Sequence, residues 1–159
     1  MEPEREIARM RREIKQVLDW MLVDFAVTLR DRDQRAPHPG RMPQELDAWL
    51  ATRGEFIALG DDWDRLKPEP AMGYIYTLLT RSLTYDVPLM PEAAAVEMTA
   101  RIFAQIGEPV FAFTNADLDL AGTGMRSFKG LVPERVFPTA AVMLIGPEHI
   151  GGIIVTCED

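Results

Sequence analysis

Histidine and cysteine are scarce in this chain of 159 residues, which has only His38, His149 and Cys157. Zinc and other soft-metal sites usually need several such ligands, and a nucleophilic site needs a base beside its nucleophile. None of the three stands beside another histidine or cysteine in the sequence. His149 and Cys157 would also lie roughly 25 Å apart at the two ends of one strand. We therefore expect no soft-metal site, no Cys–His dyad and no bound cofactor.

The chain also lacks a long apolar segment. Residues 1–15 are crowded with charge where a signal peptide would need an apolar run. The run from Trp20 to Leu29 is interrupted by Asp24 and has about half of the ~20 residues that a membrane-spanning helix needs. A lone cysteine cannot form an internal disulfide. These features predict a cytoplasmic protein that does not bind or cross a membrane.

Basic residues are too few to balance the acidic ones, and the net charge is −8. Residues 1–53 carry ten basic and ten acidic side chains, whereas residues 54–159 carry seven and fifteen. The later two thirds therefore hold the whole excess of negative charge. Because nucleic-acid binding depends on Lys and Arg that neutralise phosphates, we expect no nucleic-acid partner.

Hydrophobic residues make up 47% of the chain and charged residues 26%, which is ordinary for a folded domain. The length suits a single domain over residues 1–159. The patterns divide it into a helical part, about 1–107, and a β part, about 110–159. We expect an α+β fold in which N-terminal helices, the first of them long, pack on a small C-terminal antiparallel sheet.

In the helical part, apolar residues recur at spacings of three and four from Ile7 to Leu29. This spacing predicts one amphipathic helix over about residues 3–31, on the order of 40 Å long, whose charged start projects from the domain. The proline-rich segment 31–43 is expected to be an exposed loop. Phe56–Leu59 has the length of an edge strand. Three further helices are predicted, from Pro43 to Gly54, from Pro70 to before Pro88, and from Pro91 to a left-handed stop at Gly107.

In the β part, β-branched and aromatic runs over 110–114, 135–145 and 150–157 predict a small sheet. The turn at 146–149 favours an antiparallel hairpin between the last two runs. Gly151 and Gly152 indicate a bulge or a close backbone approach. Both faces of the middle strand are apolar, so helices must cover both faces or one face is an interface. An uncovered face and a projecting helix would together predict a homodimer.

The first candidate site is the sequence Asp61-Asp62-Trp63-Asp64, in which three carboxylates flank one tryptophan. One interpretation is a turn in which an aspartate caps the next helical turn and the indole folds back onto the core. The other is a partner-binding surface, in which the indole anchors the contact and the carboxylates steer a basic protein.

The second candidate site is the connector 115–130, which holds two carboxylates, two cations and several glycines. In an extended segment its two aspartates would face one side and could hold a magnesium or calcium ion, while a cation met a phosphate. The alternatives are an ordinary solvated connection and a protein contact. The residues of this ligand-loop hypothesis are Asn115, Asp117, Asp119, Arg126 and Lys129.

No motif in the chain is specific enough to indicate a family or to name a catalytic residue. A small acidic chain with no assembled catalytic motif is better explained as a binding protein than as an enzyme. The expected partner is a basic protein surface, as for an inhibitor, an immunity protein or an adaptor. The alternatives are a small metal-assisted or phosphate-ligand enzyme that uses the 115–130 connector, and a homo-oligomeric structural protein.

Overall fold

The structure, a computed structural model, describes residues 3–17, 21–29, 39–81, 88–108, 110–118, 120, 125–132 and 139–157. In chain order the elements are α1 (Pro3–Val17), β1 (Met21–Leu29), η2 (Pro39–Arg41), α2 (Met42–Ala51), η3 (Gly60–Asp62), β2 (Asp64–Leu66), α3 (Pro68–Thr80), α4 (Glu92–Ile106), β3 (Phe111–Thr114), β4 (Ala116–Leu118), β5 (Met125–Phe128), β6 (Thr139–Ile145) and β7 (His149–Cys157), where η marks a 3-10 helix. The fold is α+β, as the sequence predicts.

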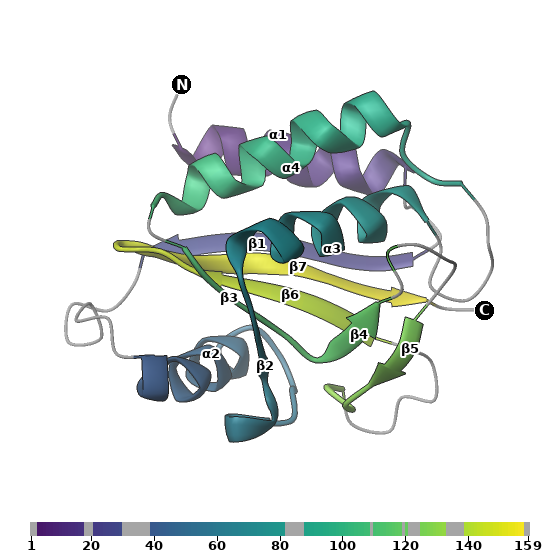
Figure 1. Ribbon diagram of the computed structural model, residues 1–159. Coiled ribbons are helices and arrows are strands. Elements are labelled where there is room, and N and C mark those ends of the chain that lie inside the picture. Colours follow the sequence, from purple (N-terminus) through teal and green to yellow (C-terminus); the bar gives the residue numbers. More distant parts are fainter. Residues whose placement is uncertain are drawn as a thin grey trace.

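The strands form a five-stranded antiparallel sheet in the order β1-β7-β6-β3-β2, and β4 pairs separately with β5. Helices α1, α3 and α4 lie on one face of the sheet, and α2 and η3 lie on the other (Figure 1). The molecule therefore has three layers with the sheet in the middle.

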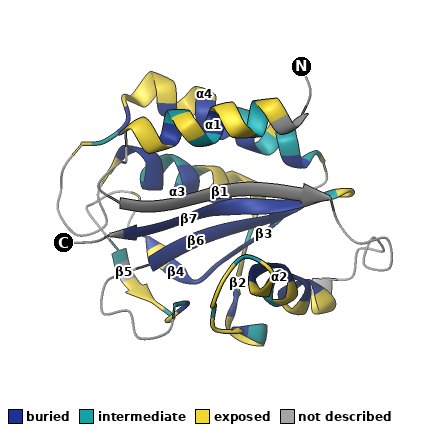
Figure 2. Ribbon diagram, turned by 180° about the vertical axis from the view of Figure 1, so that it is seen from behind, coloured by how far each residue is buried: buried dark blue, intermediate teal, exposed yellow. Residues whose placement is uncertain are grey.

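The middle strand β6 is buried along its whole length, and its side chains alternate between two cores. Val142 and Leu144 belong to the cluster under α1, α3 and α4. Ala141, Met143 and Ile145 belong to the cluster under α2. Figure 2 shows the buried strands between the two helical layers. The prediction that helices cover both faces is confirmed, and residues 135–138 of the predicted strand lie outside the described residues.

The predicted helix over 3–31 is wrong over Met21–Leu29, and residues 18–20 and 30–31 lie outside the described residues. Residues Met21–Leu29 instead form the edge strand β1, which pairs with β7 from Met21↔Cys157 to Leu29↔His149. A short apolar run fits a buried helix and a buried strand equally well, so its local pattern cannot decide between them. Pairing with β7, which is distant in the sequence, supplies the missing information. A helix of 15 residues is about 22 Å long, about half the predicted length.

The predicted edge strand at Phe56–Leu59 is also wrong. This segment has no regular structure, and its Leu59 and Phe56 side chains pack on the cluster under α2. The second edge strand is β2, which follows shortly afterwards and pairs with β3. Two strands of the sheet, β1 and β2, therefore come from the part of the chain that was predicted to be helical.

The other helices are near their predicted positions. α2 begins at Met42, after η2, and residues 31–38 of the predicted loop lie outside the described residues. α3 begins at Pro68 and ends at Thr80, earlier than predicted at both ends. α4 ends at Ile106, and the next residue, Gly107, has the positive φ of 82° expected of a glycine stop, although its ψ of 168° differs from the left-handed helical conformation. None of the described helices has both the length and the apolar character that a membrane crossing requires.

Two predicted backbone features of the last hairpin are confirmed. The amide of Gly146 donates to the carbonyl of His149 over 2.8 Å and closes the turn between β6 and β7. At Gly152, a Cβ atom would collide with the carbonyl oxygen of Val142 and lie 2.9 Å from Sδ of Met143. Glycine is therefore needed there because the neighbouring strand approaches closely.

Arg101 of α4 pairs with two glutamates of α1. Arg101 donates through Nε to Oε1 of Glu6 over 2.9 Å and through Nη1 to Oε2 of Glu13 over 2.6 Å. Burial lowers the pKa of Arg101, but the hydrogen bonds to Glu13 and Glu6 outweigh this effect, and its pKa is raised above the ordinary value. Arg101 therefore remains charged and joins the two helices.

Candidate functional site

The first candidate site is a bend that we call the acidic turn, residues 60–64. It consists of η3, Trp63 and the first residue of β2. Its three aspartates, Asp61, Asp62 and Asp64, are exposed, whereas Trp63 is only 5% exposed and belongs to the cluster under α2. The indole therefore packs inside the protein and is not available as the exposed anchor of a contact. This corrects the part of the partner-binding hypothesis that placed Trp63 on the surface.

Asp47 of α2 fixes the position of the acidic turn through hydrogen bonds. Its Oδ1 accepts hydrogen bonds from Nε1 of Trp63 over 2.9 Å and from the Leu59 amide over 3.1 Å. Its Oδ2 accepts a hydrogen bond from the Gly60 amide over 2.8 Å. Gly60 has a φ of 52°, a conformation that favours glycine. One carboxylate therefore accepts from the Gly60 amide and the Trp63 indole of the turn and from the Leu59 amide just before it, and so fixes the turn on α2.

Sequence reasoning missed Asp47, although one signal was present. An acidic residue stands between Leu46 and Trp49 on a short helix whose neighbouring side chains are buried. Such a residue needs local donors to offset its loss of water. The sequence does not show that these donors lie twelve to sixteen residues later.

Lys129 brings the two candidate sites together. Its Nζ lies 3.1 Å from Oδ1 of Asp64 and also donates to the backbone carbonyl of Asp62. The side chains of Lys129 and Asp64 are 40% and 59% exposed, so the ion pair itself contributes at most about 1 kcal/mol. Its main effect is to set the end of the β4–β5 hairpin against the acidic turn.

Asn115 of the ligand-loop hypothesis is buried and structural. Its Nδ2 donates to the carbonyls of Lys129, over 3.0 Å, and Thr139, over 2.7 Å. Its Oδ1 accepts from the Ala141 amide over 2.8 Å. Because these bonds use both donors and the carbonyl oxygen, Asn115 joins the hairpin to β6 and does not face a ligand. The sequence cannot show this, since all but one of these partners lie more than twenty residues away.

For the remaining members of the ligand-loop hypothesis, the described residues show no common site. Asp117 is exposed in β4 and lies opposite Ser127 of β5. Arg126 belongs to β5, and Asp119 lies outside the described residues. In the part of the chain that the structure describes, no group of three His, Cys, Asp or Glu side chains is placed to hold a metal ion.

The cavities outside the predicted sites include two larger ones and a smaller one of about 310 Å³ beside Gly107 and Glu148. A groove of about 640 Å³ runs between α3, residues 88–92 and Leu120, and the titratable side chains along its described lining are Tyr76, Arg81 and Glu92. A second cavity of about 530 Å³ lies where β2 leads into α3, and it is lined by Arg65, Leu66, Lys67, Pro68, Val110 and Phe111. Among the described residues, the linings of the two larger cavities do not contain the paired acid and base of a hydrolytic site.

Comparison of the chain with protein-family models, with curated protein sequences and with solved structures finds no match in any of the three. Inference about function therefore depends on the surfaces and cavities described above.

Proposed function

We propose that this protein is a binding protein that holds a basic protein partner on the acidic turn, without catalysing a reaction. The observation that carries this proposal is the position of Asp61, Asp62 and Asp64. All three carboxylates are exposed, Asp64 in an ion pair with Lys129, and Asp47 fixes the turn beneath them. Fixed surface carboxylates accelerate the encounter with a basic partner, because the charges need not be ordered first.

Apolar contact area is available beside the acidic turn. Ile57 and Phe128 are each 41% exposed. The Ile57 amide donates to the carbonyl of Leu131 over 2.7 Å, and Phe128 directly precedes Lys129, which contacts the turn. Protein interfaces combine apolar contacts with a charged rim. In this proposal Ile57 and Phe128, and not Trp63, make the apolar contacts with the basic partner.

Assembly as a homodimer stays a prediction, but it loses its original argument. Helices cover both faces of the sheet, and α1 is joined to α4 through Arg101. The uncovered apolar face and the projecting long helix on which the prediction depended are not found among the described residues. The basic partner is therefore the better supported of the two proposals.

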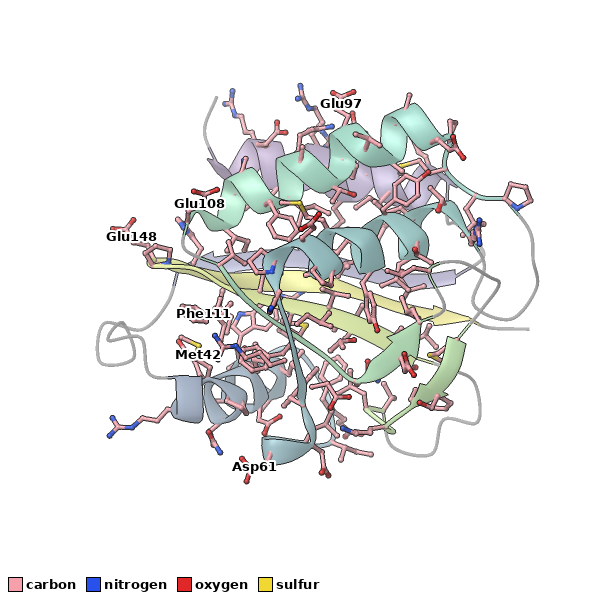
Figure 3. All side chains as sticks on the ribbon, viewed as in Figure 1. Met42, Asp61, Glu97, Glu108, Phe111 and Glu148 are labelled. Carbon is pink, nitrogen blue, oxygen red and sulfur yellow. The ribbon has the colours of Figure 1, made fainter. Side chains whose placement is uncertain are left out.

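The test compares two variants that remove the same charge. In the first, Asp61, Asp62 and Asp64 are replaced by asparagine. In the control, three exposed carboxylates elsewhere become glutamine: Glu97, Glu108 and Glu148. Figure 3 shows Glu97 and Asp61 at opposite ends of the molecule. Both variants and the unchanged protein are immobilised, and proteins captured from a lysate at low salt are eluted with rising salt and identified.

We expect a basic protein that the unchanged chain and the glutamine control retain and that the asparagine variant loses. With this protein purified, the asparagine variant should slow association by about tenfold at low salt and flatten its salt dependence, with little change in dissociation rate. Equal loss in both variants would show a general effect of net charge. Capture of no salt-sensitive basic protein would contradict the proposed function.

A further inference from the structure

Strand β2 has one side without a described partner. It is the last strand in the sheet order, and β3 is the strand it pairs with among those the structure describes. Its register with β3 is continuous, and it contains neither proline nor a bulge. The backbone is also extended at Trp63 and Lys67, so five consecutive residues run straight over about 16 Å. Figure 1 shows β2 along the front edge of the sheet.

The end of this edge opens onto the cavity of about 530 Å³. Leu66, Val110 and Phe111 supply apolar walls, and the cations Arg65 and Lys67 stand at its rim. The Arg65 guanidinium lies over the Phe111 ring, 5.2 Å from its centroid, and Phe111 is labelled in Figure 3. No carboxylate lines the described part of the cavity. Such a site suits an apolar group that carries a carboxylate.

The sign of the charge therefore changes along one short edge. Asp61, Asp62 and Asp64 lie at its start, and Arg65 and Lys67 lie at its end. An extended chain lying beside β2 would meet carboxylates first and cations about three residues later, roughly 10 Å further along. A small anion would contact only the cations. An extended peptide would contact the carboxylates, the cations and the side of β2 that has no described partner.

We propose that β2 receives an extended segment of the basic partner as an added strand. Lysine or arginine side chains of this segment lie against the acidic turn. An acidic or carboxyl-terminal residue with an apolar neighbour occupies the cavity between Arg65, Lys67 and Phe111. Strand addition supplies affinity through backbone hydrogen bonds, and the cavity and charges select the sequence. This inference rests on the proposed function, because it describes how the same partner binds.

The test uses a displayed library of short linear peptides selected on the full-length chain. Enriched peptides should carry basic residues and, three to five positions away, an acidic residue beside an apolar one. A synthetic enriched peptide is then titrated against the chain by fluorescence anisotropy. Replacing Arg65 and Lys67 by glutamine should weaken its binding by about tenfold, whereas glutamine at Arg41 and Arg53, which removes the same charge from residues that flank α2, should not.

The backbone contribution is tested on the peptide itself. Methylation of its alternate amide nitrogens leaves every side chain in place but removes the donors that a strand needs, so binding should be lost. Hydrogen exchange at the amides of residues 64–66 should also slow when the unmodified peptide binds. Equal binding of the methylated and unmodified peptides would overturn the inference, as would a library that yields no enriched peptide.

The two proposals fail in different ways. If asparagine at Asp61, Asp62 and Asp64 abolishes peptide binding while the Arg65 and Lys67 variant and methylation do not, the acidic turn binds basic partners without strand addition. In that case the further inference is overturned and the proposed function stands. If methylation and the Arg65 and Lys67 variant abolish binding but the asparagine variant does not, strand addition is correct and the role of the acidic turn is wrong.

Discussion

Replacement of Asp47 by alanine should destabilise the protein and displace the acidic turn without changing a residue on it. Asp47 is the shared acceptor for the Trp63 indole and for the amides of Leu59 and Gly60. Trp63 and Leu59 are buried, so water cannot readily replace the carboxylate at their N–H groups. Each buried donor left without an acceptor costs on the order of 1–3 kcal/mol.

The expected size of the effect follows from the three donors. Taking about 1 kcal/mol for each buried donor, and less for the Gly60 amide, which is only half-buried, gives a loss of about 2–3 kcal/mol in the free energy of unfolding. Asparagine at position 47 should lose about half as much. Its carbonyl oxygen can still accept from Trp63 and Leu59, but its amide group would face the Gly60 amide, donor against donor.

Urea denaturation followed by circular dichroism measures both losses. The contribution of the indole is isolated by a double-mutant cycle with Trp63→Phe, which removes the donor and keeps an aromatic ring. The coupling between Asp47→Ala and Trp63→Phe should be about 1 kcal/mol. A loss below about 0.5 kcal/mol for Asp47→Ala, or a coupling near zero, would refute the claim that this carboxylate holds the turn.

Three other substitutions test contacts that hold the fold together. Arg101→Met should lower the free energy of unfolding by about 1–3 kcal/mol in urea, because it removes the less exposed of the two cations that pair with Glu6, itself only 14% exposed, and leaves Arg9 as the other; a loss no larger than that of Arg9→Met, which removes the more exposed cation of Glu6, would contradict this. Gly152→Ala should lower stability by about 1–3 kcal/mol, because the new methyl group would collide with β6; an unchanged melting temperature would show that the strands can separate at little cost. Asn115→Ala should cost about 2–3 kcal/mol and speed hydrogen exchange in β4 and β5, and unchanged exchange there would remove its role in joining the hairpin to β6.

The elements that the sequence predicts well are those with a local signature. Helix α4 has a regular apolar stripe and ends at a glycine of positive φ. The β6–β7 hairpin has two apolar runs joined by a short turn. Strand β1 has no such signature, because the apolar run from Met21 to Leu29 suits a helix as well as a strand. Only its partner β7, more than a hundred residues later, determines which structure forms.

The candidate site divides in the same way. The exposure of Asp61, Asp62 and Asp64 follows from their charge and from the turn that they occupy. The direction of the Trp63 side chain does not, because it depends on Asp47, sixteen residues earlier. The contact of Lys129 with the acidic turn joins residues that are 65 positions apart. No pattern within a single segment could reveal either contact.

The acidic turn and the edge strand form one continuous segment that is held at both ends. At the start of this segment the Asp47 carboxylate accepts a hydrogen bond from the Gly60 amide. The segment ends at Pro68, where α3 begins. A partner that binds to such a segment does not have to order it first, so little conformational entropy is lost on this side of the interface. The affinity should then depend mainly on how well the partner's charges and backbone match the edge. Loosening the segment through Asp47 should therefore weaken binding even though every contact residue is unchanged.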